Sequence, residues 1–262
     1  MAIITLTSDW GTRTPFASSV KGAILKHIPN AQIVDITHNI SPYNIMEASF
    51  VLKNSAVNFP EGTIHLVGVN TEASLEYPHV AVLHKGHYFI GADNGIFSLL
   101  FDNMNDVEAV EIEILQESEY FTFSTRDVFV SAAKMILEGK KLKDIGNPRK
   151  ELTQKLAFKP GTYPDKIVGK VIYIDDYENV YINIDETIFK TTGKGRPFTI
   201  SFRTYDSEIN RLSKAYSDVV PGEKLALFGS TGYLEIAINQ GKGSSLLGLT
   251  LNDSVTIDFF NK

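Results

Sequence analysis

The chain has 262 residues, 43% of them hydrophobic, so it can bury a sizeable core and favours two domains over one. Its 25 basic and 31 acidic residues give a formal net charge of −6, and we expect no nucleic-acid partner because phosphate binding depends on clustered Lys and Arg. Zero cysteines exclude disulfides and thiolate metal sites. The sequence lacks both a run of about 18 apolar residues and a signal-peptide start, so we expect a cytoplasmic protein with no membrane partner.

Strand and helix signals alternate over the first part of the chain. The patterns predict strands at 2–7, 33–36 and 63–69, with helices around 20–27 and 45–52 between them. This alternation needs crossover connections, so it predicts a parallel sheet covered by helices. Further along, the sequence predicts a hairpin of strands 79–83 and 87–91 and a helix at 127–137.

The pattern changes after a stretch rich in Pro and Gly at residues 156–170. Short strand-like runs follow, with turn residues between them and no long amphipathic helix. These runs lie at 171–174, 180–184, 198–202, 224–228, 234–238 and 254–259. The sequence therefore predicts an α/β domain over residues 1–165 and a smaller β-rich domain over residues 166–262.

Short polar segments lie against the strand-like runs, at residues 8–11, 35–38, 93–95 and 124–127. In open α/β sheets the strand ends and the turns after them present polar groups to one crevice, so these segments predict a site for a small ligand. Glycine-rich nucleotide loops and the serine-hydrolase elbow are missing from the sequence. The six histidines lack metal-binding spacing, so we expect neither a metal nor a cofactor.

Eight short segments along nearly the whole chain carry one resemblance. They are residues 7–11 (TSDWG), 21–22 (KG), 33–42 (IVDITHNISP), 59–63 (FPEGT), 92–95 (ADNG), 122–127 (TFSTRD), 169–175 (GKVIYID) and 229–237 (GSTGYLEIA). In this order they resemble the S-adenosyl-L-methionine hydroxide adenosyltransferases, whose relatives include the fluorinases and chlorinases. The resemblance implies an N-terminal α/β domain with a largely parallel sheet and a C-terminal β-barrel-like domain.

The resemblance also implies a reaction and an assembly. In the family a nucleophile displaces L-methionine from the 5′ carbon of the ribose, and water as the nucleophile gives adenosine. The sulfonium already provides a good leaving group, so the protein mainly aligns and desolvates the nucleophile. The resemblance also implies a homotrimer, in which the small-molecule adenosyl ligand is enclosed between subunits.

Ligand-binding roles in the first domain fall on three residues. Asp9 matches the carboxylate that accepts hydrogen bonds from the ribose diol, a task that suits a group with two acceptor oxygens. Without the resemblance, Asp9 could equally cap the turn that follows it. Tyr43 matches an aromatic that packs on the ligand, and the alternative is an aromatic in a surface turn. Asn94 belongs to the third polar segment and is the remaining candidate there.

The second domain supplies four more candidates. Asp175 and Asn179 match residues that hold the methionine amino group, Tyr177 matches an adenine-stacking aromatic, and Ser230 matches a contact to the carboxylate. A polar turn between two strands would also contain residues such as Asp175. Asn183, by contrast, is expected to be structural.

The chain departs from the family at the catalytic set. Hydrolases of the family use an Asp that opens Asp-Pro-Gly-Val-Gly-Thr-x-Arg, the Arg that ends it, and a His in Thr-Phe-His-Gly-Arg-Asp. Here these positions are Asn70, Tyr77 and Ser124. Neither Asn nor Ser is a base near neutral pH, and losing a positioned acid or base costs about a hundredfold or more in rate.

Two further observations bear on the nucleophile. Thr125 matches a small hydroxyl that faces the nucleophile pocket, whereas Ala73 removes a hydroxyl that fluorinases are expected to have. His79 and Glu72 lie close to Tyr77 in sequence, so a rearranged acid-base set is one interpretation, and exposed loop residues are the other.

Two functions therefore remain open. The first is a hydrolase of S-adenosyl-L-methionine that is weak because its catalytic set is replaced. The second is a catalytically silent protein that binds S-adenosyl-L-methionine or adenosine.

Overall fold

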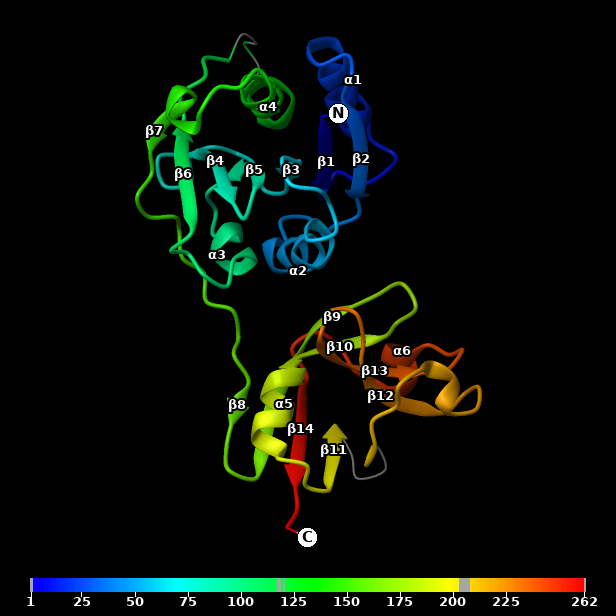
Figure 1. Cartoon of the computed structure of the whole chain (residues 1–262). Helices are drawn as coiled ribbons and strands as arrows, with labels where there is room; N and C mark the ends of the chain where they lie inside the picture. Colours follow the sequence, from blue (N-terminus) through cyan, green and yellow to red (C-terminus); the bar gives the residue numbers. More distant parts are fainter. Residues whose placement is uncertain (1, 117–118, 120, 203–207, 262) are drawn as a thin grey trace. The chain divides into compact units, whose positions relative to one another are not determined.

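The structure is a computed structural model that describes residues 2–116, 119, 121–202 and 208–261. The chain divides into two compact units, Met1–Leu156 and Ala157–Lys262, each with its own buried core (Figure 1). The sequence predicts a boundary near residue 165. The division lies earlier because the short strand β8 (Gly161–Thr162) pairs with β9 (Lys166–Ile174) and so belongs to the second unit.

The described strands of the first unit form one sheet, in the order β2-β1-β3-β5-β4-β6-β7. They are β1 (Ile3–Ser8), β2 (Gln32–Thr37), β3 (Ile64–Gly68), β4 (His79–His84), β5 (His87–Ala92), β6 (Val107–Ile112) and β7 (Gly146–Pro148). Strands β2, β1, β3 and β5 are parallel, which confirms the predicted crossover pattern. The remaining pairings are antiparallel. Lys85 and Gly86, both with positive φ, make the tight turn that reverses the chain between β4 and β5.

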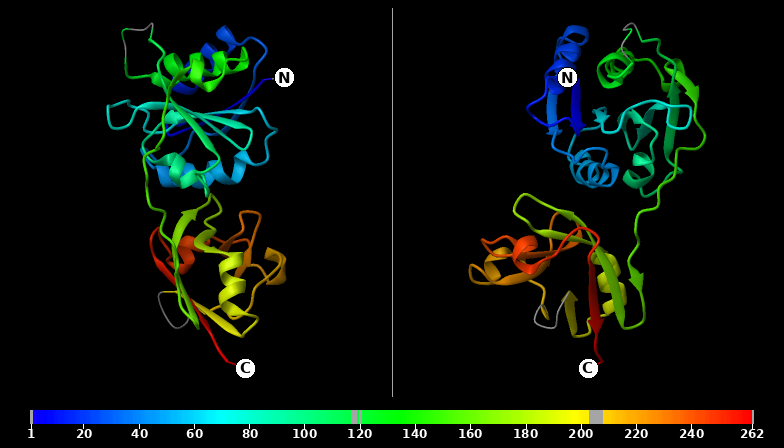
Figure 2. Two further views of the ribbon diagram at one scale, coloured as in Figure 1. Left: turned by 60° about the vertical axis from the view of Figure 1, so that its left-hand side comes forward. Right: turned by 180° about the vertical axis from the view of Figure 1, so that it is seen from behind.

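Helices cover both faces of this sheet (Figure 2). They are α1 (Phe16–His27), α2 (Ile45–Ala56), α3 (Ile96–Leu100) and α4 (Val130–Leu137), with the π-helix η1 (Thr125–Phe129) leading into α4 and the 3-10 helix η2 (Leu142–Asp144) after it. Ile4 and Leu6 of β1 pack on the face of α1 and α4, whereas Val67 and Phe89 pack on the face of α2 and α3. This separation follows from the period of two along each strand.

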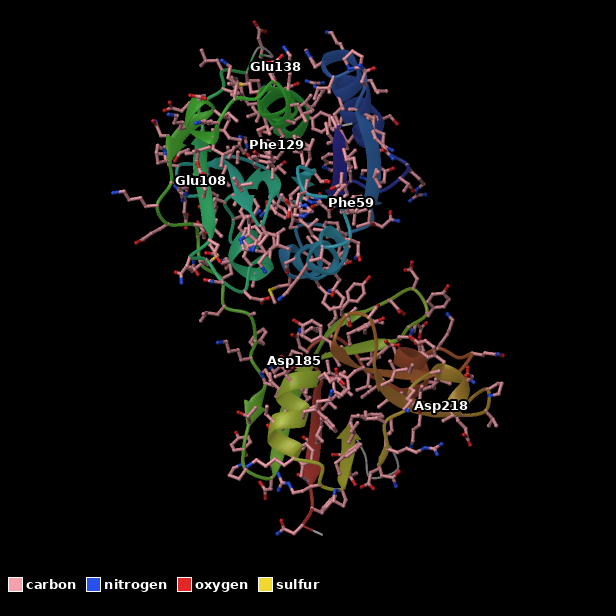
Figure 3. All side chains as sticks on the ribbon, viewed as in Figure 1. Phe59, Glu108, Phe129, Glu138, Asp185 and Asp218 are labelled. Atoms are coloured by element: carbon pink, nitrogen blue, oxygen red, sulfur yellow. The ribbon has the colours of Figure 1, made fainter. Side chains whose placement is uncertain are left out.

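The second unit is a curled antiparallel half-barrel with strand order β11-β14-β9-β10-β13-β12 and β8 added to β9. Its other described elements are β10 (Val180–Asp185), α5 (Glu186–Gly193), β11 (Phe198–Phe202), the 3-10 helix η4 (Tyr216–Asp218), β12 (Lys224–Phe228), β13 (Tyr233–Ile238), α6 (Gly243–Leu247) and β14 (Ser254–Phe259). Asp185, labelled in Figure 3, begins α5 by accepting a hydrogen bond from the N–H of Ile188 at 2.7 Å. The predicted β-rich domain is thus confirmed.

None of the helices in the described ranges is long and apolar enough to cross a membrane.

Candidate functional site

Asp9 lies immediately after β1 and organises the turn before α2. Its Oδ2 accepts a hydrogen bond from the backbone N–H of Tyr43 at 2.9 Å. Tyr43 adopts a positive φ of 63°, and its side chain is 72% exposed. Among the described residues no hydrogen bond reaches Oδ1 of Asp9. The carboxylate therefore performs the turn-holding role, and its contact with a ligand stays a prediction.

Trp10 joins the carboxyl ends of three strands to the segment before η1. Its indole stacks on His38 after β2, with ring centroids 5.9 Å apart, and meets Phe123 edge-on at 5.6 Å. A Cβ at Gly68, the last residue of β3, would lie only 2.4 Å from the indole, so this close approach requires glycine. The polar segments after β1 and β2 and the segment leading into η1 thus converge at one edge of the sheet.

A series of polar contacts runs from the buried Ser8 and His38 to the more exposed Asp35 and Lys21 beside this edge. Ser8 Oγ and His38 Nδ1 share a hydrogen bond of 2.7 Å, and His38 Nε2 lies 3.2 Å from Asp35 Oδ1. Lys21 Nζ donates to Asp35 Oδ2 at 2.5 Å. Burial raises the pKa of Asp35, but the hydrogen bond from Lys21 and the charge of His38 outweigh it and leave that pKa below its ordinary value. The sequence segments contain all four residues, but their spacing alone does not show that the four side chains contact one another.

Asn70 follows β3 in a strained conformation, with a positive φ of 48°. Its backbone carbonyl accepts from Nδ2 of Asn94 at 3.0 Å, and the same amide nitrogen lies 3.3 Å from the Val69 carbonyl. Oδ1 of Asn94 accepts from the N–H of Ile96. The buried Asn94 therefore ties the start of the loop after β3 to the start of α3, and its direct contact with a ligand stays a prediction.

Tyr77 lies in the loop between β3 and β4, in a turn with Ser74. Its N–H donates to Ser74 Oγ at 3.0 Å, while its carbonyl accepts from the N–H of Ser74. A hydrogen bond to Glu76 raises the pKa of the Tyr77 phenol, which therefore stays neutral at pH 7. The positive charge that Arg brings to this position in family hydrolases is absent here.

Ser124 and Thr125 are both buried where the chain enters η1. The hydroxyl of Thr125 has no hydrogen-bond partner within the described ranges. Buried polar groups without partners are uncommon, and π-helical turns are frequent at functional sites. Thr125 therefore offers an unsatisfied hydroxyl at the place where the sequence predicted a group facing the nucleophile.

His79, at the start of β4, holds the loop between β3 and β4. Its Nε2 donates to the carbonyl of Thr71 at 2.9 Å, and its ring meets the edge of Phe129. Burial lowers the pKa of His79, so the ring is neutral at pH 7 with Nε2 carrying the proton. Glu72 is exposed. Nε2 of His79 is thus already hydrogen-bonded to the Thr71 carbonyl. A role for His79 or Glu72 in a rearranged acid-base set stays a prediction.

The second unit brings Asp175, Tyr177 and Asn179 together in the turn between β9 and β10. Asp175 Oδ1 accepts from the N–H of Tyr177 at 2.9 Å and of Asn179 at 2.8 Å, and its Oδ2 accepts from Asn179 Nδ2 at 3.1 Å. Tyr181 Oη also donates to Oδ2, at 3.3 Å. The Tyr177 side chain is 78% exposed. The turn therefore fixes an acid–amide pair and presents one aromatic ring to the outside.

Ser230 lies in the turn between β12 and β13 and is exposed. The turn closes with a hydrogen bond from the N–H of Gly232 to the Gly229 carbonyl at 3.0 Å. Asn183 is structural, as predicted, because its Oδ1 accepts from the N–H of Lys170 and its Nδ2 donates to the Phe158 carbonyl. In the described ranges no group of three or more His, Asp or Glu side chains is placed to hold a metal ion.

An α/β unit with polar strand ends, followed by an antiparallel half-barrel with polar turns, defines a two-domain protein of the mixed α/β class. Family models of the SAM hydroxide adenosyltransferase N-terminal and C-terminal domains match residues 4–146 and 169–256. The chain belongs to this family, which confirms the resemblance read from its segments.

Named relatives extend over nearly the whole chain. The (R)-S-adenosyl-L-methionine hydrolase of Methanocaldococcus jannaschii is 29% identical, over 97% of this chain and 95% of that protein. A fluorinase of Nocardia brasiliensis is 25% identical, over 90% of each. An uncharacterised conserved protein of Thermotoga maritima, known as a crystal structure, superposes with a TM-score of 0.88 and 29% identity, over 98% of this chain and 99% of that one.

Proposed function

We propose that this protein binds S-adenosyl-L-methionine and displaces its L-methionine with water, slowly, to give adenosine. Support for binding comes from its family and from the carboxylates of Asp9 and Asp175, each held in a defined orientation by backbone hydrogen bonds. The observation that carries the hydrolytic part is the buried, unpartnered hydroxyl of Thr125. An attacking water needs a partner of this kind while it is aligned behind the ribose 5′ carbon.

The slow rate follows from the residues at the family's catalytic positions. Asn70 and Ser124 cannot accept a proton from water near neutral pH, and Tyr77 carries no positive charge there. The neighbouring His79 already uses one ring nitrogen to hold a loop carbonyl. Water would therefore attack with positioning and desolvation but without an efficient general base.

The second candidate is a silent binding protein for S-adenosyl-L-methionine or adenosine. The observation that favours it is the same replacement at Asn70, Tyr77 and Ser124, because binding groups and catalytic groups are lost independently. Both candidates require the adenosyl site, and only turnover separates them.

We further propose that the active form is a homotrimer with the adenosyl ligand between subunits. Its support is that the candidate ligand residues are divided between the two units of the chain, with Asp9 in the first and Asp175 in the second. Sedimentation of the purified protein at micromolar concentration should give the trimer mass, and a monomer alone would contradict it.

The binding proposal is tested by calorimetry with adenosine and with S-adenosyl-L-methionine. Replacing Asp9 by Ala removes a charged hydrogen-bond acceptor from the ribose diol, so both affinities should fall by about 1.5 to 3 kcal/mol. Glu108→Ala is the matched control, because this exposed carboxylate lies on β6, separated from β1 by β3, β5 and β4 (Figure 3). Unchanged affinity in Asp9→Ala would remove Asp9 from the site.

A further inference from the structure

Glu235 is a buried carboxylate at the centre of the second unit's polar side chains, and sequence reasoning did not single it out. It lies on β13, is 2% exposed, and is paired in register with Tyr181 of β10 and Leu227 of β12. Its Oε1 accepts a hydrogen bond from Tyr216 Oη at 2.5 Å. Burying a carboxylate is costly unless it is hydrogen-bonded, paired or neutralised, so its partners here need an account.

One side of Glu235 connects to the turn that holds Asp175. Tyr181, its cross-strand neighbour, donates from Oη to Asp175 Oδ2 at 3.3 Å. The other Asp175 oxygen is held by the N–H groups of Tyr177 and Asn179. The position of the Tyr181 ring therefore helps to set the Asp175 carboxylate, and Glu235 is the polar group opposite that ring.

The other side of Glu235 connects to the turn that holds Ser230. An added Cβ at Gly229 would lie 3.2 Å from Glu235 Oε2, so this carboxylate oxygen lies against the backbone just before Ser230. Glycine at this position leaves room for the carboxylate oxygen, whereas a Cβ would make a tight contact with it. Glu235 thus lies between the two turns that carry the predicted amino-acid contacts, Asp175 with Asn179 and Ser230.

The groups that face Glu235 are one carboxylate, two phenols and one apolar side chain. The polar groups facing it are Asp175 beyond β9, Tyr181 of β10 and Tyr216 of η4, while β12 contributes the apolar Leu227. Burial, together with the charge of Asp175, raises the pKa of Glu235. Burial also raises the pKa values of both phenols, which therefore remain neutral hydrogen-bond donors.

We propose that Glu235 is a positioning residue for the amino-acid part of the ligand, acting on Asp175 through Tyr181 and on Ser230 through the Gly229 backbone. This inference rests on the proposed binding of S-adenosyl-L-methionine. It assigns to Glu235 the selectivity for ligands that carry an α-amino acid over adenosine, which lacks one. Glu235 touches no reacting atom, so its effect is on binding and not on the chemical step.

The test is calorimetric titration of the full chain with S-adenosyl-L-methionine and, separately, with adenosine. Glu235→Leu removes the carboxylate at similar size, and we expect the dissociation constant of S-adenosyl-L-methionine to rise about tenfold or more, the loss of a hydrogen bond to a charged group. The dissociation constant of adenosine should change less than about twofold. Glu235→Gln retains an acceptor for Tyr216 and should recover most of the affinity.

Tyr181→Phe is a second variant that leaves Glu235 in place and breaks the link to Asp175. It should weaken S-adenosyl-L-methionine binding in the same selective way, and it keeps the test decisive if Glu235→Leu does not fold. Glu223→Gln, which removes one exposed carboxylate just before β12, is the charge-matched control and should behave as wild type.

The outcomes separate the two proposals. Equal losses for both ligands, or no loss in Glu235→Leu and Tyr181→Phe, would overturn the role of Glu235 while the binding function stands. A wild-type chain that binds neither ligand would overturn the proposed function and this inference with it.

Discussion

At the scale of single residues, the first unit contains a buried histidine that lies apart from the candidate site. His65 on β3 is fully buried, with Nδ1 at 2.7 Å from Thr5 Oγ1 and Nε2 at 3.3 Å from His87 Nδ1. Phe89 stacks on its ring, and Phe59, labelled in Figure 3, meets it edge-on. Burial, reinforced by the charge of His87, lowers the pKa of His65 from 6.5 to about 3.

This pKa predicts acid sensitivity of the first unit. A folded-state pKa below the unfolded value means that the unfolded chain binds more protons, so stability present above pH 6.5 is lost as the pH falls toward 3. Between pH 7 and pH 5, His65 alone should cost about 2 kcal/mol of unfolding free energy. Trp10 is the single tryptophan and lies in this unit, so its fluorescence in urea titrations reports the transition.

His65→Gln removes the titrating ring, and we expect its loss of stability between pH 7 and pH 5 to be smaller than that of wild type by about 2 kcal/mol. His27→Gln, at the exposed end of α1, is the matched control. The same loss in His65→Gln as in wild type would show that another group causes the acid sensitivity.

At the scale of elements, strand ends and the loops after them build the candidate site. The loop after β3 begins with the strained Asn70 and is held at two points, by Asn94 at its start and by His79 through the Thr71 carbonyl. These tethers come from neighbouring strands of the same sheet. The loop that carries two of the replaced catalytic positions is therefore attached to the rigid part of the unit.

Asn94→Ala tests this attachment. It leaves the Asn70 carbonyl and the Ile96 N–H without their side-chain partner, so we expect the first unit to lose about 1 to 3 kcal/mol of unfolding free energy. Trp10 fluorescence in urea measures the loss, with Asn58→Ala on the surface as the control. A loss as small as that of Asn58→Ala would mean that the loop is held by other contacts.

Periodicity and turn residues were enough to predict the elements that form the parallel part of the first sheet and the long strands of the second unit. They did not predict β6 and β7, because the acidic residues Glu108 and Glu111 lie three positions apart and break the period of two in β6, and β7 is only three residues long. α3 and α5 were also missed, since helices of five and eight residues leave little periodicity to detect.

The candidate site was predictable only in its residue types. The sequence segments contained Asp9, Asp175 and Asn179, but not the hydrogen bonds that orient them. The tethering role of Asn94 depends on contacts with residues 24 and 25 positions earlier in the chain. Glu235 reads as an ordinary strand residue until its register beside Tyr181 is known.

At the scale of the whole molecule, each of the two units carries its own set of candidate polar groups. In the first unit Asp9 follows β1, and Ser124 and Thr125 are buried at the start of η1, while the second unit carries the Asp175 turn on a half-barrel. Both match the corresponding domain models of one family. The proposed difference from the hydrolases of the family lies at three positions of the first unit, Asn70, Tyr77 and Ser124.

We propose that this chain retains the adenosyl site and has lost efficient activation of water. The combined variant Asn70→Asp, Tyr77→Arg and Ser124→His restores the family's acid-base set. All three change together, because an Asp alone lacks its counter-charge and a lone His lacks a partner to orient it. Since Ser124 is buried, circular dichroism and adenosine affinity must first show that the variant keeps its fold and its site.

The most direct measurement is incubation of wild type and this variant with S-adenosyl-L-methionine, followed by chromatography for adenosine and L-methionine. Wild type should release both slowly or not at all, and the variant should release them at least about a hundredfold faster, the lower bound for general acid-base assistance. A wild-type protein that already releases adenosine as fast as the variant would show that water activation has not been lost.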